Sequence, residues 1–400
     1  MRPSTLLSTA TLAAVTAAQS LTNDTYLGYP VLDVSASSPL DLASIPANTI
    51  SRYWLRPGIS QGNIPYFLPV IIARGTSDSL DTGRKLSLSA SIHGDELNGV
   101  PVVQRVFQTL VASEVVANGE FNGTIIGVPQ LNPQGNFMNA RNFYTPGSSG
   151  FLTNLNRIMP GEAEPEEASL TDAYAGQIWY GLWGNTSNVD VAVDFHCLAT
   201  GADGPLWAYA DFDFPYVQRL AELAMPDVIK IDPGEPGSVE TTWVDYGVPA
   251  ITLEIGPAKQ WNGDLIDRAE EFVYRLLEDL GMMSAESLVE GDFDSEASYK
   301  GTNFSSVYVT QSGWVNVTVG VLDDVEEGQE VGTLYNWFGD VVETLTASVS
   351  GRVLQVQTDP AVDAGRGVVD IVYNATASGE ESNSRKMKVR RGIGGRGRAF

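Results

Sequence analysis

The chain has only two histidines, and each stands where a strand-like stretch ends. His93 lies in the segment SIHGDELNG (residues 91–99), three residues before Glu96, and His196 follows the segment VDVAVDF. The carboxyl ends of strands in open α/β sheets line the ligand crevice. Two histidines and one glutamate with an open fourth position are a ligand set of catalytic zinc. We therefore expect His93, Glu96 and His196 to converge on one zinc ion per chain.

Each of these features has a simpler interpretation when it is taken alone. A His-x-x-Glu sequence arises by chance in many proteins, and a histidine at a strand end is usually only hydrogen-bonded. Because both histidines of the chain share this placement, coincidence is the weaker explanation. Cys197, the single cysteine, rules out an intramolecular disulfide, and we expect it to be a small buried hydrophobic residue below the site.

A third strand-like segment, VPAITLEIG (residues 248–256), brings Glu254 to the same sheet edge. Glutamate is rare in buried strands unless it is paired. Its carboxylate could take a proton from the attacking water and pass it to the leaving amine. The alternative is a structural ion pair.

The segment between the histidines is rich in asparagine and arginine. Residues 131–161, LNPQGNFMNARNFYTPGSSGFLTNLNRIMPG, include Arg141, Asn156 and Arg157. Guanidinium groups bind carboxylates through two parallel hydrogen bonds and polarise carbonyl oxygens. Beside a metal this loop would hold a carboxylate-bearing substrate, whereas without one it would be an ordinary surface loop.

The motifs HGDE, NP…R…NLNR…PG, DFH and LEIG, in this order, resemble the succinylglutamate desuccinylase/aspartoacylase family of the zinc carboxypeptidase-like (M14) superfamily. The resemblance covers about residues 65–375, and the combined string is specific although each piece alone is weak. The resemblance implies that His93, Glu96 and His196 bind zinc and that Glu254 acts as general base and acid. It also implies that Arg141 polarises the scissile carbonyl and that Asn156 and Arg157 bind the substrate carboxylate.

Two further residues near these motifs bear on the resemblance. Asn154 stands where the family's usual Asp-Leu-Asn-Arg has its aspartate. Asp194, two residues before His196, could orient that histidine as a ligand, or could simply cap the strand end.

Hydrophobic periodicity predicts the elements that would position these residues. Strand patterns alternate with helical ones, which predicts an α/β fold with a largely parallel sheet. The resemblance implies, more specifically, a mixed central sheet flanked by helices with a smaller C-terminal all-β domain. We expect strands at 66–75, 85–92, 123–133, 188–197 and 248–256, and helices at 97–117, 213–224 and 263–282, the last with Gly281 as its C-cap.

Composition changes divide the chain into segments. Short strand-like runs separated by Gly and Asp from Thr302 to Tyr373 predict a small barrel of two similar hairpin sets. The expected segments are a signal peptide at 1–18, an N-terminal arm at 19–65, a catalytic domain at 66–295, a β-domain at 301–375 and a disordered basic tail at 376–400.

The charge and the N-terminus bear on partners and location. A net charge of −25 and a pI of about 4.3 argue against nucleic acid or an anionic membrane as partner. The first 18 residues have the charged start, apolar centre and small cleavage residues of a secretory signal peptide, so we expect a secreted protein. Six Asn-x-Ser/Thr sequons are candidate glycosylation sites: Asn23, Asn122, Asn185, Asn303, Asn316 and Asn374.

The sequence thus predicts a secreted zinc-dependent amidohydrolase acting on an N-acyl amino acid or a small peptide with a free carboxylate. A metallocarboxypeptidase that releases C-terminal amino acids is the alternative within the same chemistry. The alternative without catalysis is a secreted binding protein that binds its ligand through the C-terminal β-module.

Overall fold

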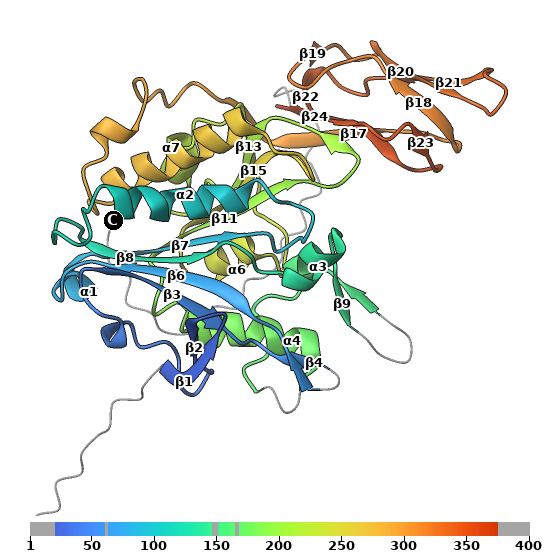
Figure 1. The fold of residues 1–400 in the computed structure, drawn as a ribbon. Helices are drawn as coiled ribbons and strands as arrows, with labels where there is room; N and C mark the ends of the chain where they lie inside the picture. Colours follow the sequence, from blue (N-terminus) through green and yellow to red (C-terminus); the bar gives the residue numbers. More distant parts are fainter. Residues whose placement is uncertain (1–20, 61–62, 146–150, 165–167, 375–400) are drawn as a thin grey trace, which may run out of the picture.

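A computed structural model describes residues 21–60, 63–145, 151–164 and 168–374 (Figure 1). Its main element is an 11-stranded mixed sheet. The strands follow one another across the sheet in the order β1 (Leu21–Tyr26), β2 (Tyr29–Leu32), β3 (Thr49–Leu55), β6 (Leu68–Arg74), β8 (Gly123–Val128), β7 (Arg84–Ala90), β11 (Val191–Leu198), β15 (Ala250–Pro257), β13 (Leu206–Ala210), β14 (Val228–Ile231) and β16 (Tyr299–Gly301).

The centre of this sheet is parallel, as the alternation of strands and helices predicted. β8, β7, β11 and β15 run in the same direction, whereas the flanking strands β6 and β13 pair antiparallel to β8 and β15. The chain leaves β7 toward β8 on one side, and later leaves β11 toward β15 on the other. A crevice opens at the carboxyl ends of strands where the strand order reverses in this way.

Helices cover both faces of the sheet. α2 (Gly99–Ala112) and α7 (Gly263–Asp279) lie side by side on one face, where α5 (Val217–Leu223) joins them in one hydrophobic core. On the opposite face α4 (Leu170–Gly176) and α6 (Val239–Asp245) contribute to a second core rich in tryptophan (Figure 1). Two short helices, α1 (Ser79–Thr82) and α3 (Pro133–Met138), follow β6 and β8.

The three predicted helices are present, and each is shorter than expected. α2 begins at Gly99 and ends at Ala112 rather than at 117, because the chain turns away at Glu114, whose φ is 55°. α5 begins only at Val217, since Tyr216 before it has a φ of 71°. α7 ends at Asp279 rather than at 282, and its C-cap is Leu280 rather than Gly281. Gly281 is the next residue, and its φ of 66° is the left-handed conformation that commonly follows a helix end.

Residues 21–65 contain strands that the sequence did not reveal. β1, β2 and β3 extend the main sheet at one edge, and the short strands β4 (Ile59–Ser60) and β5 (Ile64–Pro65) form a separate hairpin. Another small hairpin, β9 (Phe143–Thr145) and β10 (Phe151–Thr153), lies within the Asn- and Arg-rich segment. The expected signal peptide (1–18) and basic tail (376–400) lie outside the described residues.

The C-terminal part is all β, as predicted, but it forms two antiparallel sheets around a valine-rich core instead of a small barrel. One sheet contains β12 (Ala202–Asp203), β22 (Gly351–Gln357), β24 (Gly367–Tyr373) and β17 (Asn303–Tyr308), with β19 (Asp324–Val325) beside β22. The other contains β21 (Val341–Thr346), β20 (Glu330–Tyr335), β18 (Gly313–Val317) and β23 (Ala361–Val362).

β12 belongs to the catalytic part of the chain, so its pairing with β22 fixes the two parts together. None of the helices in the described ranges is both long and apolar enough to cross a membrane.

Candidate metal centre and active site

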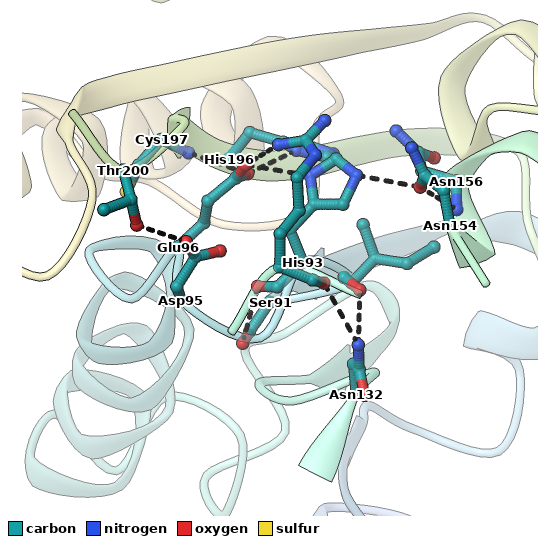
Figure 2. Close-up of polar contacts among 12 residues, drawn as sticks. Ser91, His93, Asp95, Glu96, Asn132, Asn154, Asn156, His196, Cys197 and Thr200 are labelled. Carbon is teal, nitrogen blue, oxygen red and sulfur yellow. Dashed lines mark hydrogen bonds and ion pairs between the residues drawn. The ribbon is translucent and has the colours of Figure 1, made fainter. Parts of the chain in front are cut away.

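The three predicted metal ligands meet at the carboxyl ends of β7 and β11. His93, Glu96 and His196 are all buried, and their candidate ligand atoms lie within 4.8 Å of one another. The Glu96 carboxylate lies between the two imidazoles, with Oε1 2.9 Å from Nδ1 of His93 and Oε2 2.8 Å from Nδ1 of His196 (Figure 2). The two histidines thus present the same ring nitrogen to a common point.

The loop after β7 is held in place by a close approach of the backbone and by a side-chain hydrogen bond. A Cβ on Gly94 would lie 2.1 Å from the backbone carbon of Gly135, so only glycine fits between His93 and the start of α3. The side chain of Asn132 donates a hydrogen bond of 3.1 Å to the backbone oxygen of Ile92. These contacts fix the loop that carries His93 and Glu96.

His196 reaches the site because of the alternation along β11. Val193 and Phe195 belong to the core with α2 and α7, so Asp194 and His196 project from the opposite face of the sheet. Glu254 lies directly across from His196 in the register of β11 and β15, and projects from the same face.

Each imidazole is also held from its far side. Nε2 of His196 is 2.7 Å from Oδ2 of Asp194, whose other oxygen accepts a 2.6 Å hydrogen bond from the Ser89 hydroxyl. Nε2 of His93 is 3.1 Å from Oδ1 of Asn154. If both Nε2 atoms donate, the Nδ1 lone pairs stay free for a metal ion. Asn154 therefore keeps the acceptor that an aspartate would offer, without its charge.

The electrostatics of the triad suit a bound cation. Burial lowers the pKa of His93 in spite of the nearby Glu96. Burial alone would raise the pKa of Glu96, but the two histidines outweigh it and lower this pKa. Burial would likewise lower the pKa of His196, but Asp194 and Glu96 raise it well above its ordinary value. A buried anionic carboxylate flanked by imidazoles is a ligand set that zinc accepts.

Two observations show that these residues fit a metal ion. Nδ1 of His93 is buried and makes no hydrogen bond within the described part of the chain, although Glu96 lies beside it. A buried polar atom without a partner is rare in folded proteins unless a ligand or water satisfies it. The ligand atoms of the triad are also close enough for one ion to touch all three.

Cys197 is not part of this ligand set. Its side chain is 2% exposed, and its Sγ accepts a hydrogen bond from the backbone N–H of Asn98. Burial raises the pKa of the Cys197 thiol well above its ordinary value, with the Glu96 charge adding to the effect. Its backbone N–H donates to Oε2 of Glu96 at 3.3 Å, so Cys197 supports a ligand through its main chain. The prediction of a small buried residue is confirmed.

Glu254 is a carboxylate beside the triad that is not one of the three candidate metal ligands. It lines the same cavity as His93 and His196, and its Oε2 is buried without a hydrogen-bond partner among the described residues. Burial raises the pKa of Glu254 to about 8, although His196 acts in the opposite direction. A carboxyl group with a pKa near neutrality can both take up and release a proton.

The predicted substrate-binding residues all line this cavity, whose volume is about 270 Å³. Arg141 donates a hydrogen bond to Oε1 of Glu96 and so lies beside the metal ligands. Asn156 is buried, and its Oδ1 accepts a 2.8 Å hydrogen bond from the backbone N–H of Val239 at the start of α6. Nε of Arg157 is 4.0 Å from Oε1 of Glu235.

The cavity also contains residues that sequence reasoning missed: Tyr209, Lys230, Asp232, Glu240, Thr252 and Phe304. Lys230 and Glu240 are nevertheless unusual, because charged side chains at 6% and 3% exposure are rare. The sequence does contain a signal for Lys230, because a lysine interrupts the otherwise apolar run VIKI of β14. Phe304 comes from β17 of the C-terminal part, and nothing local in the sequence marks it.

Comparisons with known proteins agree with this site. Residues 82–280 match the family model of the succinylglutamate desuccinylase/aspartoacylase catalytic domain. No curated protein sequence matched the chain.

Similar solved structures cover most of the chain at low sequence identity. The product-bound ectoine utilization protein EutE (DoeB) from Ruegeria pomeroyi is 17% identical, with a TM-score of 0.67 over 82% of this chain and 98% of that one. An aspartoacylase family protein from Mesorhizobium loti is 22% identical, with a TM-score of 0.64 over 84% of this chain and 98% of that one. A succinylglutamate desuccinylase/aspartoacylase from Rhodobacter sphaeroides is 17% identical, with a TM-score of 0.63 over 81% and 95% of the two chains.

These structures share the fold, and the family model spans all three metal ligands and Glu254. Through residues 82–280 the chain belongs to the succinylglutamate desuccinylase/aspartoacylase family of zinc-dependent deacylases.

Proposed function

We propose that the chain is a zinc-dependent hydrolase that cleaves the amide bond of an N-acyl amino acid or of another small carboxylate-bearing substrate. The observation that carries the proposal is the buried triad of His93, Glu96 and His196. Oε2 of Glu254 lies in the same cavity without a hydrogen-bond partner among the described residues. The family acts on N-acyl amino acids, and EutE, the succinylglutamate desuccinylases and the aspartoacylase family proteins share the fold.

The residues around the triad can each perform one task in such a reaction. Zinc, when bound by the triad, supplies Lewis-acid activation of water and of the scissile carbonyl. Glu254 takes a proton from the attacking water and donates it to the leaving nitrogen. Arg141 donates hydrogen bonds to the carbonyl oxygen as negative charge develops there. Arg157 and Asn156 bind the substrate carboxylate and so orient the amide.

Metal content and hydrolysis, measured together, test this proposal. We expect about one zinc per chain in the purified protein, and chelator-sensitive hydrolysis of N-acyl amino acids. His196→Ala should lose both the zinc and the activity. A released acyl group identifies a deacylase, whereas release of C-terminal amino acids from dipeptides identifies a metallocarboxypeptidase. Failure of the intact chain to take up zinc would contradict the mechanism and favour a binding protein.

We also propose that the protein is secreted and glycosylated. The support is the signal-like N-terminal sequence together with the exposure of several sequons, namely Asn122, Asn185, Asn316 and Asn374. Protein recovered from the culture medium of a eukaryotic host should lack the first 18 residues and lose mass on enzymatic deglycosylation. Full-length, unmodified protein that stays inside the cells would contradict this proposal.

A further inference from the structure

Glu240 is a buried acid in the catalytic cavity that the mechanism above does not use. It lies on α6, which packs against β11 and β15, and it lines the same cavity as His93, His196 and Glu254. Its side chain is almost completely buried, with the whole residue 3% exposed. Oε2 accepts a 2.9 Å hydrogen bond from the Thr241 hydroxyl. Within the described ranges no lysine or arginine forms an ion pair with it.

The cationic residues of the cavity are already engaged by other acids. Arg141 donates to Glu96, Arg157 lies 4.0 Å from Glu235, and Lys230 is paired with Asp232. Of the acids that line the cavity, Glu240 and Glu254 are the two that form no ion pair with a lysine or arginine of the described segments. Because Glu254 has a role in proton transfer, Glu240 is the acid that remains free to contact a ligand.

The surroundings of Glu240 favour a positively charged partner. Burial raises the pKa of Glu240 to about 8, and the nearby charges of Asp211, Asp232 and Asp194 add to the increase. A buried carboxyl group is stabilised when it is paired with a cation. An ammonium group beside Glu240 would interact with these acids together and would displace the proton from its carboxyl group.

The position of Glu240 relative to the carboxylate-binding residues defines which part of the substrate would reach it. The N–H of Val239, the residue before Glu240, donates to Oδ1 of Asn156. A substrate whose carboxylate is held by Asn156 and Arg157 therefore lies next to the first turn of α6. Its amino-acid side chain can then extend toward Glu240.

Resting on the proposed function, we propose that Glu240 is a specificity-determining residue that selects N-acyl amino acids with a cationic side chain. The compact ammonium group of a diamino acid suits a cavity of about 270 Å³ better than a larger planar guanidinium. The pairing is between the substrate ammonium and the Glu240 carboxylate, and it involves no bond-making step.

Two isosteric substrates test the proposal on the zinc-loaded enzyme. Nα-acetylornithine and Nα-acetylnorleucine differ by an ammonium in place of a methyl group. We expect kcat/KM to favour the ornithine derivative by roughly 10- to 100-fold, the range of a hydrogen bond between charged groups. Glu240→Gln should bring this ratio near one, mainly through the loss of kcat/KM for the ornithine derivative. Asp245→Asn, which removes an exposed acid from the same helix, should keep the preference.

Binding of the free amino acids gives a readout that does not depend on turnover. Ornithine should raise the Tm of the zinc-loaded protein more than norleucine does, and Glu240→Gln should remove the difference. An unchanged preference in Glu240→Gln, or equal Tm shifts in the wild type, would overturn the role of Glu240. If no N-acyl amino acid is hydrolysed while the ornithine-specific Tm shift is present, the proposed function fails but the ammonium site stands.

Discussion

At the scale of single residues, Glu254 and Glu96 show how position separates two buried carboxylates. Glu96 lies between two imidazoles, which lower its pKa. Glu254 lies on a neighbouring strand without a hydrogen-bond partner for Oε2 in the described structure, and burial raises its pKa to about 8. One carboxylate is thereby kept anionic for a metal ion, and the other can exchange a proton.

Glu254→Gln should abolish proton transfer without removing a metal ligand. We expect kcat to fall by about 10²- to 10⁴-fold, the usual contribution of a general acid–base group, with zinc content still near one per chain. Zinc analysis and steady-state kinetics on the same preparations measure both quantities. Activity close to that of the wild type would show that another group moves the proton.

At the scale of secondary structure elements, the sequence predicted the centre of the fold and the ends of the strands that carry the site. Those strands have strong alternation and apolar cores, so the placement of His93, His196 and Glu254 followed from local pattern. The helix α6 is buried at six consecutive positions of seven and so has no amphipathic period, and it was missed together with Glu240. Phe304 was also missed, because its contact with the cavity depends on how the C-terminal sheets dock.

Phe304, on β17, offers a test of whether the C-terminal sheets limit substrate size. Its ring lines the catalytic cavity although it is partly exposed. Phe304→Ala should enlarge the cavity and raise kcat/KM for bulky acyl groups relative to acetyl by several-fold, since a few apolar carbons change recognition by about 1–3 kcal/mol. An acyl-chain series from acetyl to hexanoyl measures this ratio. Phe338→Ala, which alters a fully solvated aromatic residue of the same part of the chain, is the control and should leave the ratio unchanged.

At the scale of the whole molecule, the catalytic and C-terminal parts share one apolar cluster and a strand pairing. Deleting the C-terminal sheets would therefore expose apolar surface. Leu198 and Trp207 of the catalytic part pack in one cluster with Leu354 and Val372. Point substitutions are therefore better probes than truncation. The buried acids of the catalytic cavity also lower the free energy of unfolding of the whole fold, so their effect is best measured with point substitutions in the full chain.

The stability of the metal-free protein should fall as the pH rises from about 5 to 8. Glu240 and Glu254 have pKa values of about 8 in the folded chain, against 4.5 for an ordinary glutamate. Between these values the folded state holds protons that the unfolded state has released, so raising the pH favours unfolding. Each such group contributes a slope of up to about 1.4 kcal/mol per pH unit.

Glu240→Gln separates this effect from every other titration in the molecule. The variant cannot ionise at position 240, so the pH dependence of its free energy of unfolding should be shallower than that of the wild type by about one proton. Denaturant unfolding of the metal-free wild type and of Glu240→Gln at pH 5, 6, 7 and 8 measures both slopes. Parallel curves for Glu240→Gln and the wild type would mean that Glu240 is already ionised in the folded chain. The cavity would then hold a standing negative charge before any cationic ligand arrives.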